Sequence, residues 1–331
     1  MGLKEKPIAI DCLVVQQQVA RPIDWKNIFG ADRPLRVEIG SGDGDYLLRS
    51  AQQESQSHWI GIEQEWERIK KTLRKVELAR GKISAGVPLN NIRVLKVDVR
   101  LALERLFVPL SVEKFFCLFP CPWPKNRHVK HRLFSPEFLR LANSRLVDGG
   151  EIKIVTDFRP FVQWVLEQIP QTGFSWTQEI TAPRFATKFE RKWCSQGQQE
   201  FYELSLRKTQ HVDVPLEEDA VLQFYYVKDF FWERFAFQDL VGQPAVLLKE
   251  SLFDREHEKV MLRVIVAEKH ITQQVWIMIV RCPQGWCIAK APGSAIIPTP
   301  GVAKAILLVA EAAGRSSAST FWASDDPAQA E

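Results

Sequence analysis

Residues 35–44 read Leu-Arg-Val-Glu-Ile-Gly-Ser-Gly-Asp-Gly, a short apolar run that passes directly into a glycine-rich loop. Four later apolar runs are separated by helix-like segments. The runs lie at 59–62, 92–97, 115–119 and 152–155, and the helix-like segments at 45–56, 65–80, 100–107, 135–146 and 160–169. Strands that alternate with helices predict a doubly wound, Rossmann-like α/β sheet, largely parallel, with helices on both faces. Runs at 174–179 and 200–206 alternate apolar with polar residues, which predicts an antiparallel pair at the sheet edge.

The spacing of the glycines separates two kinds of ligand. Ligands of an open α/β sheet bind beyond the carboxyl ends of its strands, where glycine lets the backbone turn sharply. A dinucleotide site prefers G-x-G-x-x-G, but Gly40, Gly42 and Gly44 follow G-x-G-x-G, with Glu38 before the loop and Asp43 inside it. Carboxylates repel a pyrophosphate and suit a sulfonium and an ammonium group, both of which S-adenosylmethionine carries. A nicotinamide dehydrogenase is therefore disfavoured.

Two more acids follow the next two apolar runs. Glu63 lies about 20 residues past the glycine loop, where a carboxylate can accept from two ribose hydroxyls. Asp98 follows the third run, where a carboxylate can accept from an adenine amine. Each acid alone is more often an ordinary turn or cap residue. Acids after three successive strands, beside a glycine loop, predict a nucleoside pocket without phosphates.

A basic segment follows the fourth run. Residues 119–132 read Phe-Pro-Cys-Pro-Trp-Pro-Lys-Asn-Arg-His-Val-Lys-His-Arg. The prolines stiffen the exit from the strand. The last eight residues hold four Lys/Arg, two His and no acid. Such a run is more often a solvated surface, but at the ligand-binding edge of the sheet it predicts phosphate contacts with RNA.

The chain changes character beyond about residue 210. Residues 211–219 are polar and acidic and read as a linker, whereas runs at 244–253, 259–268 and 271–281 predict strands, and Thr299 to Ala313 predicts a helix. We therefore expect a first domain at 1–210, a small α+β domain at 211–314 and a disordered tail at 315–331. Residues 1–210 carry 33 Lys/Arg against 24 Asp/Glu, and residues 211–331 carry 11 against 16. This asymmetry favours a polyanion as partner of the first domain.

Composition argues against several other classes. The six cysteines are irregularly spaced and form no CxxC pair, so neither a metal site nor a disulfide framework is expected. No apolar stretch approaches about 18 residues and no signal peptide is evident, so we expect no membrane span and a cytoplasmic location. The sequence leaves the oligomeric state open between monomer and homodimer.

Five segments together resemble the bacterial tRNA (guanine-N7)-methyltransferase family, in order, across about residues 20–208. They are Glu38 to Gly44, Gly61 to Glu63, Phe119 to Arg132, Thr156-Asp157 and Thr187-Lys188-Phe189-Glu190-Arg191. The Pro-Trp-Pro-Lys and Thr-Lys-Phe-Glu-Arg motifs are the most specific of them. The resemblance implies a seven-stranded class I fold that depends on S-adenosylmethionine. It also implies methylation of N7 of guanine 46 in the tRNA variable loop, with S-adenosylhomocysteine as the second product.

The resemblance carries roles only to matching positions. It implies cofactor binding by Glu38, Gly40, Gly42, Gly44, Glu63, Asp98 and Cys121. It implies substrate binding by Lys125, Arg127, His128, Lys130, Arg132, Asp157, Thr187, Lys188, Phe189 and Glu190, and it makes Cys121 and Asp157 the candidate catalytic residues. Without the resemblance, core packing is an alternative role for Phe189, and Asp157 fits a strand-end cap about as well as a functional residue.

Cys121 departs from the family pattern, which usually has an aspartate at this position. Attack by the N7 lone pair removes no proton, so alignment of the reactants can supply most of the acceleration without a strong base. We therefore expect Cys121 to weaken activity without abolishing it. The alternatives are a tRNA-binding relative with weak or lost catalysis, and a methyltransferase that acts on another RNA or on a small molecule.

Overall fold

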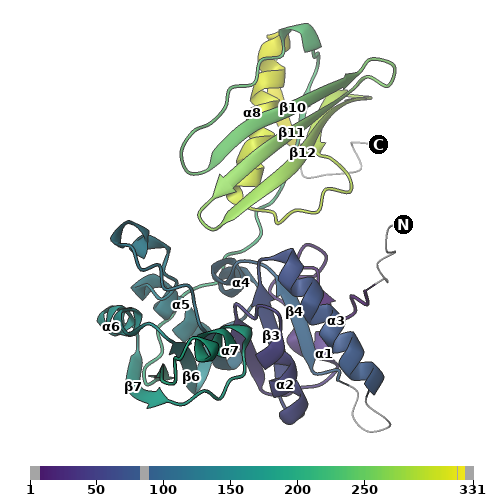
Figure 1. Ribbon diagram of the computed structural model, residues 1–331. Coiled ribbons are helices and arrows are strands. Elements are labelled where there is room, and N and C mark those ends of the chain that lie inside the picture. The colour runs from purple at the N-terminus through teal and green to yellow at the C-terminus, as the bar shows by residue number, and fades with distance from the viewer. Residues whose placement is uncertain (1–7, 83–88, 319, 325–331) are drawn as a thin grey trace. The chain divides into compact units, whose positions relative to one another are not determined.

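The chain folds into two compact units, and the division along the chain falls between Glu217 and Glu218. The computed structural model (Figure 1) describes residues 8–82, 89–318 and 320–324. Within these residues, no helix is long and apolar enough to cross a bilayer.

An eight-stranded sheet with the order β1-β4-β3-β2-β5-β6-β8-β7 forms the first unit. Its strands are β1 (Leu13–Val14), β2 (Leu35–Ile39), β3 (His58–Glu63), β4 (Ile92–Lys96), β5 (Val112–Leu118), β6 (Leu146–Thr156), β7 (Phe174–Thr181) and β8 (Phe201–Lys208). The first six are parallel where they pair, and β8 runs antiparallel to both β6 and β7. The predicted doubly wound sheet and its antiparallel edge pair are therefore confirmed. The two-residue strand β1 was not predicted, because two residues show no periodicity.

Helices connect these strands. They are α1 (Trp25–Phe29), α2 (Asp45–Gln53), α3 (Trp66–Lys82), α4 (Val99–Arg105), α5 (Pro136–Arg145), α6 (Arg159–Gln168), α7 (Lys188–Ser195) and the 3₁₀ helix η1 (Asn126–His131). All six residues of β3 are buried, as expected for a central strand covered on both faces. The chain order of the strands reverses between β2 and β5, which lie side by side, so a topological switch point lies at the end of β2.

The segment expected to be a linker is attached to the first unit as far as Glu217. Arg145 is fully buried, and its guanidinium donates to the carbonyls of Val214 (2.7 Å) and Pro215 (3.3 Å). The buried side chain of Asn143 donates to and accepts from the backbone of the same segment. Backbone groups of residues 212–215 thus have buried side-chain partners in the first unit, although the polar composition of 211–219 is typical of a linker. The expected start of the second domain at 211 is therefore corrected to 218.

An antiparallel six-stranded sheet with the order β10-β11-β12-β13-β9-β14 forms the second unit. Its strands are β9 (Phe224–Val227), β10 (Ala245–Asp254), β11 (Lys259–Glu268), β12 (Ile271–Cys282), β13 (Gly285–Lys290) and β14 (Phe321–Ser324); a short 3₁₀ helix, η2 (Trp232–Arg234), follows β9. Helix α8 (Pro300–Ser317) is capped by Thr299 and packs against the apolar face of the sheet (Figure 1). This confirms a small α+β region.

The tail expected to be disordered from 315 is instead ordered at its start. Residues 315–317 complete α8, and β14 pairs with β9. Aromatic contacts support the pairing. The ring of Phe321 lies 5.8 Å from that of Tyr225, and the ring of Trp322 lies 5.8 Å from that of Tyr226. Residues 325–331 lie outside the described part of the chain.

Candidate active site

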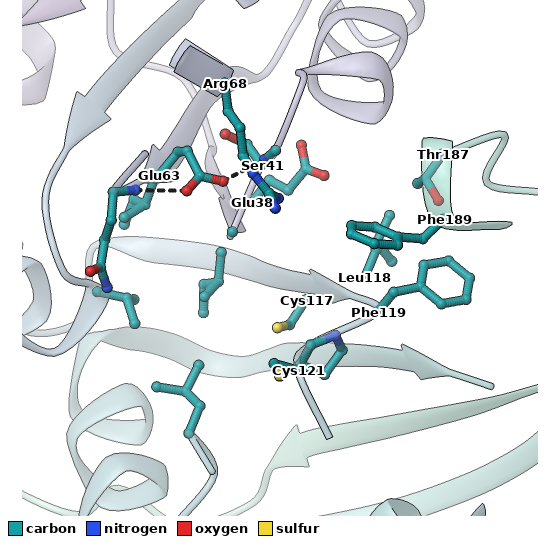
Figure 2. A pocket seen from close by; sticks show the side chains of 18 of the residues that line it. Glu38, Ser41, Glu63, Arg68, Cys117, Leu118, Phe119, Cys121, Thr187 and Phe189 are labelled. Atoms are coloured by element: carbon teal, nitrogen blue, oxygen red, sulfur yellow. Dashed lines mark hydrogen bonds between the residues drawn. The ribbon is translucent and has the colours of Figure 1, made fainter. Parts of the chain in front are cut away.

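A cavity of about 620 Å³ lies at the carboxyl ends of the parallel strands, a volume typical of small-molecule sites. Figure 2 shows side chains from the glycine loop, from the ends of β3 and β5 and from the segment at 187–189 around it. Ten of the residues expected at the site line this cavity. They are Glu38, Gly40, Gly42, Glu63, Asp98, Cys121, Asp157, Thr187, Lys188 and Phe189.

The glycine loop folds back on the end of β3. The amides of Gly40 and Ser41 donate to the carbonyl of Ile62 at 2.9 and 3.0 Å. Gly44 has a left-handed backbone (φ +75°) at the N-terminus of α2, and a Cβ there would stand 2.5 Å from the Thr72 side chain. Gly44 does not line the cavity, so its part is to bring the loop close against α3.

Glu63 anchors the glycine loop as well as lining the cavity. One carboxylate oxygen, Oε2, accepts from the amide of Gly42 at 2.9 Å. The other, Oε1, accepts from the amides of Gln64 (2.8 Å) and Glu65 (3.0 Å), as Figure 2 shows in part. A carboxylate has about four acceptor positions, so at least one is left for a ligand hydroxyl.

Glu38 is a buried carboxylate at the end of β2, only 3% exposed. Burial raises the pKa of its carboxyl well above the ordinary range, although a backbone hydrogen bond from Leu47 and the charge of Arg49 act in the opposite direction. Among the described residues, no hydrogen-bond partner reaches its Oε2 or the buried Oγ of Ser41. An unpaired buried carboxylate is costly, so this position favours a cationic ligand group.

Asp98 is the third acid and also the N-cap of α4. Its Oδ1 accepts from the amide of Arg100 and its Oδ2 from Nε2 of Gln64, both at 2.7 Å. Gln64 also lines the cavity but was not predicted, because glutamine after a strand carries no distinctive pattern. The hydrogen bond joins the ends of β3 and β4 and holds the second and third acids side by side.

The Pro-Trp-Pro turn after β5 has a strained backbone. Phe119 and Trp123 have positive φ angles of 57° and 43°, which non-glycine residues rarely adopt. Cys121 lies between them, exposed and at the edge of the cavity. Strained residues at a ligand-binding edge are typical of functional loops.

Arg132 holds this turn in place from inside the protein. It is 8% exposed, its guanidinium donates to the carbonyls of Pro122 (2.8 Å) and Trp123 (3.2 Å), and it lies 5.0 Å from the ring of Trp164. These contacts assign Arg132 a structural role that its place in the basic segment did not indicate, and its expected contact with phosphate stays a prediction. The sequence could not separate it from its exposed neighbours, because its burial depends on α6, about 30 residues later.

The other cations of the basic segment remain outside. Lys125, Arg127 and Lys130 are exposed on or next to η1 and do not line the cavity. His128 is half-buried, with its ring 5.6 Å from that of Trp123. The stretch from Trp123 to His131 begins and ends at cavity-lining residues, so its exposed cations lie around one side of the opening.

The Thr-Lys-Phe-Glu-Arg motif divides between structure and cavity. Thr187 is the N-cap of α7, and its Oγ1 accepts from the amide of Glu190 at 3.1 Å. Glu190 is 2% exposed, and its carboxylate accepts from the amides of Arg184, Phe185 and Ala186. Glu190 thus folds the loop that presents Lys188 and Phe189 to the cavity, and its expected contact with the substrate stays a prediction.

Asp157 follows β6 and lines the cavity. In the sheet, β6 and the strand that ends at Glu63, β3, lie on opposite sides of the central pair β2 and β5. It is half-buried, and within the described part of the chain its carboxylate has no hydrogen-bond or ion-pair partner. It is therefore free to accept hydrogen bonds from a ligand. Sequence reasoning without the resemblance leaves a strand-end cap and a functional role about equally open for Asp157.

Comparisons with known proteins agree with this arrangement. A family model described as putative methyltransferase matches residues 32–203. The tRNA (guanine-N(7)-)-methyltransferase of Chlorobium phaeobacteroides is 41% identical over 190 residues, which cover 57% of this chain and 89% of that protein. Those of Thermotoga maritima and Aquifex aeolicus are 28% identical over 295 and 309 residues, which cover 85% and 91% of this chain and 90% and 98% of those proteins. The last two alignments are too long to be confined to the first unit.

Proposed function

Because this chain belongs to the family of tRNA (guanine-N7)-methyltransferases, which depend on S-adenosylmethionine, we propose that it methylates N7 of guanine 46 in the variable loop of tRNA. The observation that carries the proposal is a single cavity that joins three acids at neighbouring strand ends to the free carboxylate of Asp157.

The residues of the cavity fit S-adenosylmethionine. The buried, unpaired Oε2 of Glu38 would accept from its ammonium group, and Glu63 and Asp98 would accept from the ribose and the adenine. The methyl donor supplies an electrophilic carbon on a sulfonium. The buried ends of β2 and β5 would give the bound cofactor a surrounding of low dielectric constant on that side of the cavity.

The opposite wall of the cavity suits guanine. The N1 and N2 groups of guanine are donors, and the free carboxylate of Asp157 can accept both in a bidentate contact. Phe189 is 36% exposed and offers a ring on which a base can stack. Lys125, Arg127 and Lys130 then lie where tRNA phosphates can be neutralised as the base enters.

Methyl transfer to N7 requires alignment of the base with the methyl donor and no proton transfer. N7 of guanine has a free lone pair and no proton, so a direct displacement needs no general base. Asp157 and Phe189 act by fixing the base so that N7 faces the methyl carbon. The thiol of Cys121 contributes little to this alignment, so we expect slower methyl transfer than with an aspartate at position 121.

The test is product identification. Purified protein is mixed with labelled S-adenosylmethionine and an unmodified tRNA transcript, and the digested tRNA is analysed for 7-methylguanosine. We expect label in 7-methylguanosine with the wild-type transcript and none with a transcript in which guanine 46 is replaced by adenine. Label that persists in the replaced transcript would contradict the assignment of the position.

A tRNA-binding protein with little catalysis is the second candidate, and the observation that favours it is Cys121. This candidate predicts salt-dependent tRNA binding and normal cofactor binding without 7-methylguanosine. A methyltransferase for another RNA predicts product only when that RNA replaces tRNA, so the same assay with total RNA separates the two.

A further inference from the structure

The cavity has an excess of carboxylates, but its expected ligand also carries one. Seven acidic side chains line it: Glu38, Asp43, Asp45, Glu63, Glu65, Asp98 and Asp157. S-adenosylmethionine and S-adenosylhomocysteine both end in an α-carboxylate beside the ammonium group. In this environment the ligand carboxylate needs a cation that is not already paired with one of these acids.

Three arginine or lysine side chains line the cavity. Nη1 of Arg100 lies 3.9 Å from Oδ2 of Asp98. Nζ of Lys188 lies 3.9 Å from Oδ2 of Asp43. Within the described part of the chain, the third cation, Arg68, has neither a hydrogen bond from its guanidinium nor an ion pair. Arg68 is therefore the cation whose charge is still available to a ligand.

Arg68 is also well placed. It lies in the first turn of α3, just after the end of β3, and Figure 2 shows its side chain extending toward Ser41 and Glu38. Its Nη1 stands 3.7 Å from the position that a Cβ on Gly42 would take, so the guanidinium lies against the glycine loop. The group that would bind a carboxylate and the acid that would bind the ammonium thus line the same cavity.

The contact between Arg68 and Phe189 strengthens this assignment. Cζ of Arg68 lies 5.9 Å from the centroid of the Phe189 ring. An aromatic ring beside the guanidinium reduces its access to water, and an ion pair is stronger where water is excluded. A guanidinium can also hold a carboxylate through two parallel hydrogen bonds, which a lysine cannot do.

We propose that Arg68 binds the α-carboxylate of the methyl donor and of its product. The inference rests on the proposed use of this cavity for S-adenosylmethionine. It makes Arg68 a cofactor-binding residue that selects ligands with an intact amino-acid end.

The test compares two ligands that differ only in the carboxylate. The full-length protein and Arg68→Ala are titrated calorimetrically with S-adenosylhomocysteine and with its decarboxylated analogue, S-adenosyl-3-thiopropylamine. We expect Arg68→Ala to weaken binding of S-adenosylhomocysteine about 10- to 100-fold and to change binding of the analogue less than about 3-fold. Equal losses for both ligands, or no loss for either, would overturn the proposal.

Matched variants separate the role of Arg68 from its neighbours. Arg68→Lys keeps the charge but cannot form two parallel hydrogen bonds to one carboxylate. Its affinity for S-adenosylhomocysteine is expected to fall between those of the wild type and Arg68→Ala. Arg100→Ala removes the other cavity arginine and should affect the two ligands alike. A carboxylate-selective loss in Phe189→Leu as large as in Arg68→Ala would assign the effect to the ring and overturn the proposal.

The titration also distinguishes failure of this inference from failure of the proposed function. It uses no tRNA, so selective binding of S-adenosylhomocysteine through Arg68 can be established even when no 7-methylguanosine forms. If the wild-type protein does not bind S-adenosylhomocysteine, both the assignment of the cavity and the role of Arg68 are wrong.

Discussion

Cys121 lies at the edge of the cavity, where the family usually has an aspartate. A neutral thiol is a weak acceptor, whereas a carboxylate would accept strongly from donors on either ligand. We expect Cys121→Asp to raise kcat about 10-fold, which corresponds to about 1.4 kcal/mol of better alignment in the transition state. Single-turnover formation of 7-methylguanosine measures the effect without interference from product release.

Cys121→Ser serves as the control, since a hydroxyl accepts without a negative charge. We expect it to lie between the wild type and Cys121→Asp. A rise of several orders of magnitude in Cys121→Asp would instead mean that the native protein is nearly inactive and would favour the tRNA-binding candidate.

The buried carboxyl of Glu38 makes stability and ligand binding oppose each other. Because burial raises its pKa, the folded protein holds this proton to higher pH than the unfolded chain does. The free energy of unfolding contributed by Glu38 therefore falls as pH rises from the ordinary carboxyl range through the raised pKa. Glu38→Gln cannot ionise, so we expect its Tm to fall less than that of the wild type between about pH 5 and about pH 8.

Ligand-induced stabilisation completes this prediction. S-adenosylhomocysteine should raise the Tm of the wild type at about pH 8 and raise that of Glu38→Gln much less, because the ammonium loses its charged partner. Parallel pH profiles of Tm in the two proteins would show that the Glu38 proton does not respond to folding.

The sequence predicted the positions of single residues only where the fold class fixes them. Glu38, Glu63 and Asp98 could be placed in one pocket because parallel strands end at the same edge of a sheet. Arg132 and Glu190 belong to the same motifs as true cavity residues, yet they are buried and bind backbone groups. Their burial is decided by neighbours far along the chain, which no local pattern records.

At the scale of elements, the segment around η1 contains two arginines with opposite roles. Arg127 is exposed, and Arg132 is buried against the Pro-Trp-Pro turn. We expect Arg127→Ala to weaken tRNA binding and to reduce the slope of log K against log salt by about 1, with an unchanged Tm. Arg132→Ala should lower the free energy of unfolding by about 1–3 kcal/mol, because the half-buried carbonyls of Pro122 and Trp123 lose their donor.

Tm measurements and tRNA titrations at several salt concentrations test the pair together. If Arg132→Ala changed the salt slope as Arg127→Ala does and left Tm unchanged, Arg132 would after all contact phosphate.

Long periodic elements were predictable, whereas short ones were not. Seven of the eight strands of the first sheet, β2 to β8, have enough apolar residues, or enough alternation, to stand out. Helices α1 and α7 have only five and eight residues, and α7 is amphipathic over barely two turns. Strands β9 and β14 have four residues each. Strand β9 pairs with β13 and β14, and β14 pairs with β9, so both depend on partners far along the chain that their own sequences do not specify.

At the scale of the whole molecule, the two units carry charge of opposite sign. The excess of basic residues lies in 1–210, together with the cavity and the exposed cations of η1. The relative from Chlorobium is matched over nearly its whole length by little more than half of this chain. Both facts favour our proposal that the cofactor and tRNA bind to the first unit.

The boundary at Glu217 can be tested by two truncations. A chain ending at 217 keeps the segment whose carbonyls accept from Arg145, and it keeps Glu217, whose carboxylate lies 3.1 Å from the buried Arg105. A chain ending at Lys208 removes these partners and leaves two buried guanidinium groups without them. We expect 1–217 to fold and bind S-adenosylhomocysteine, and 1–208 to be less stable by at least ~2 kcal/mol in urea denaturation.

Comparison of the two truncations locates the boundary by energy as well as by contacts. Equal stability of 1–208 and 1–217 would mean that residues 209–217 are the linker that their composition suggests. If 1–217 failed to fold while the full chain was stable, the first unit would depend on the second.

Retained salt-dependent tRNA affinity in 1–217 is the expected result, because the exposed cations beside the cavity are all present in it. A loss of that affinity in a folded 1–217 would place an essential RNA contact in the acidic second unit.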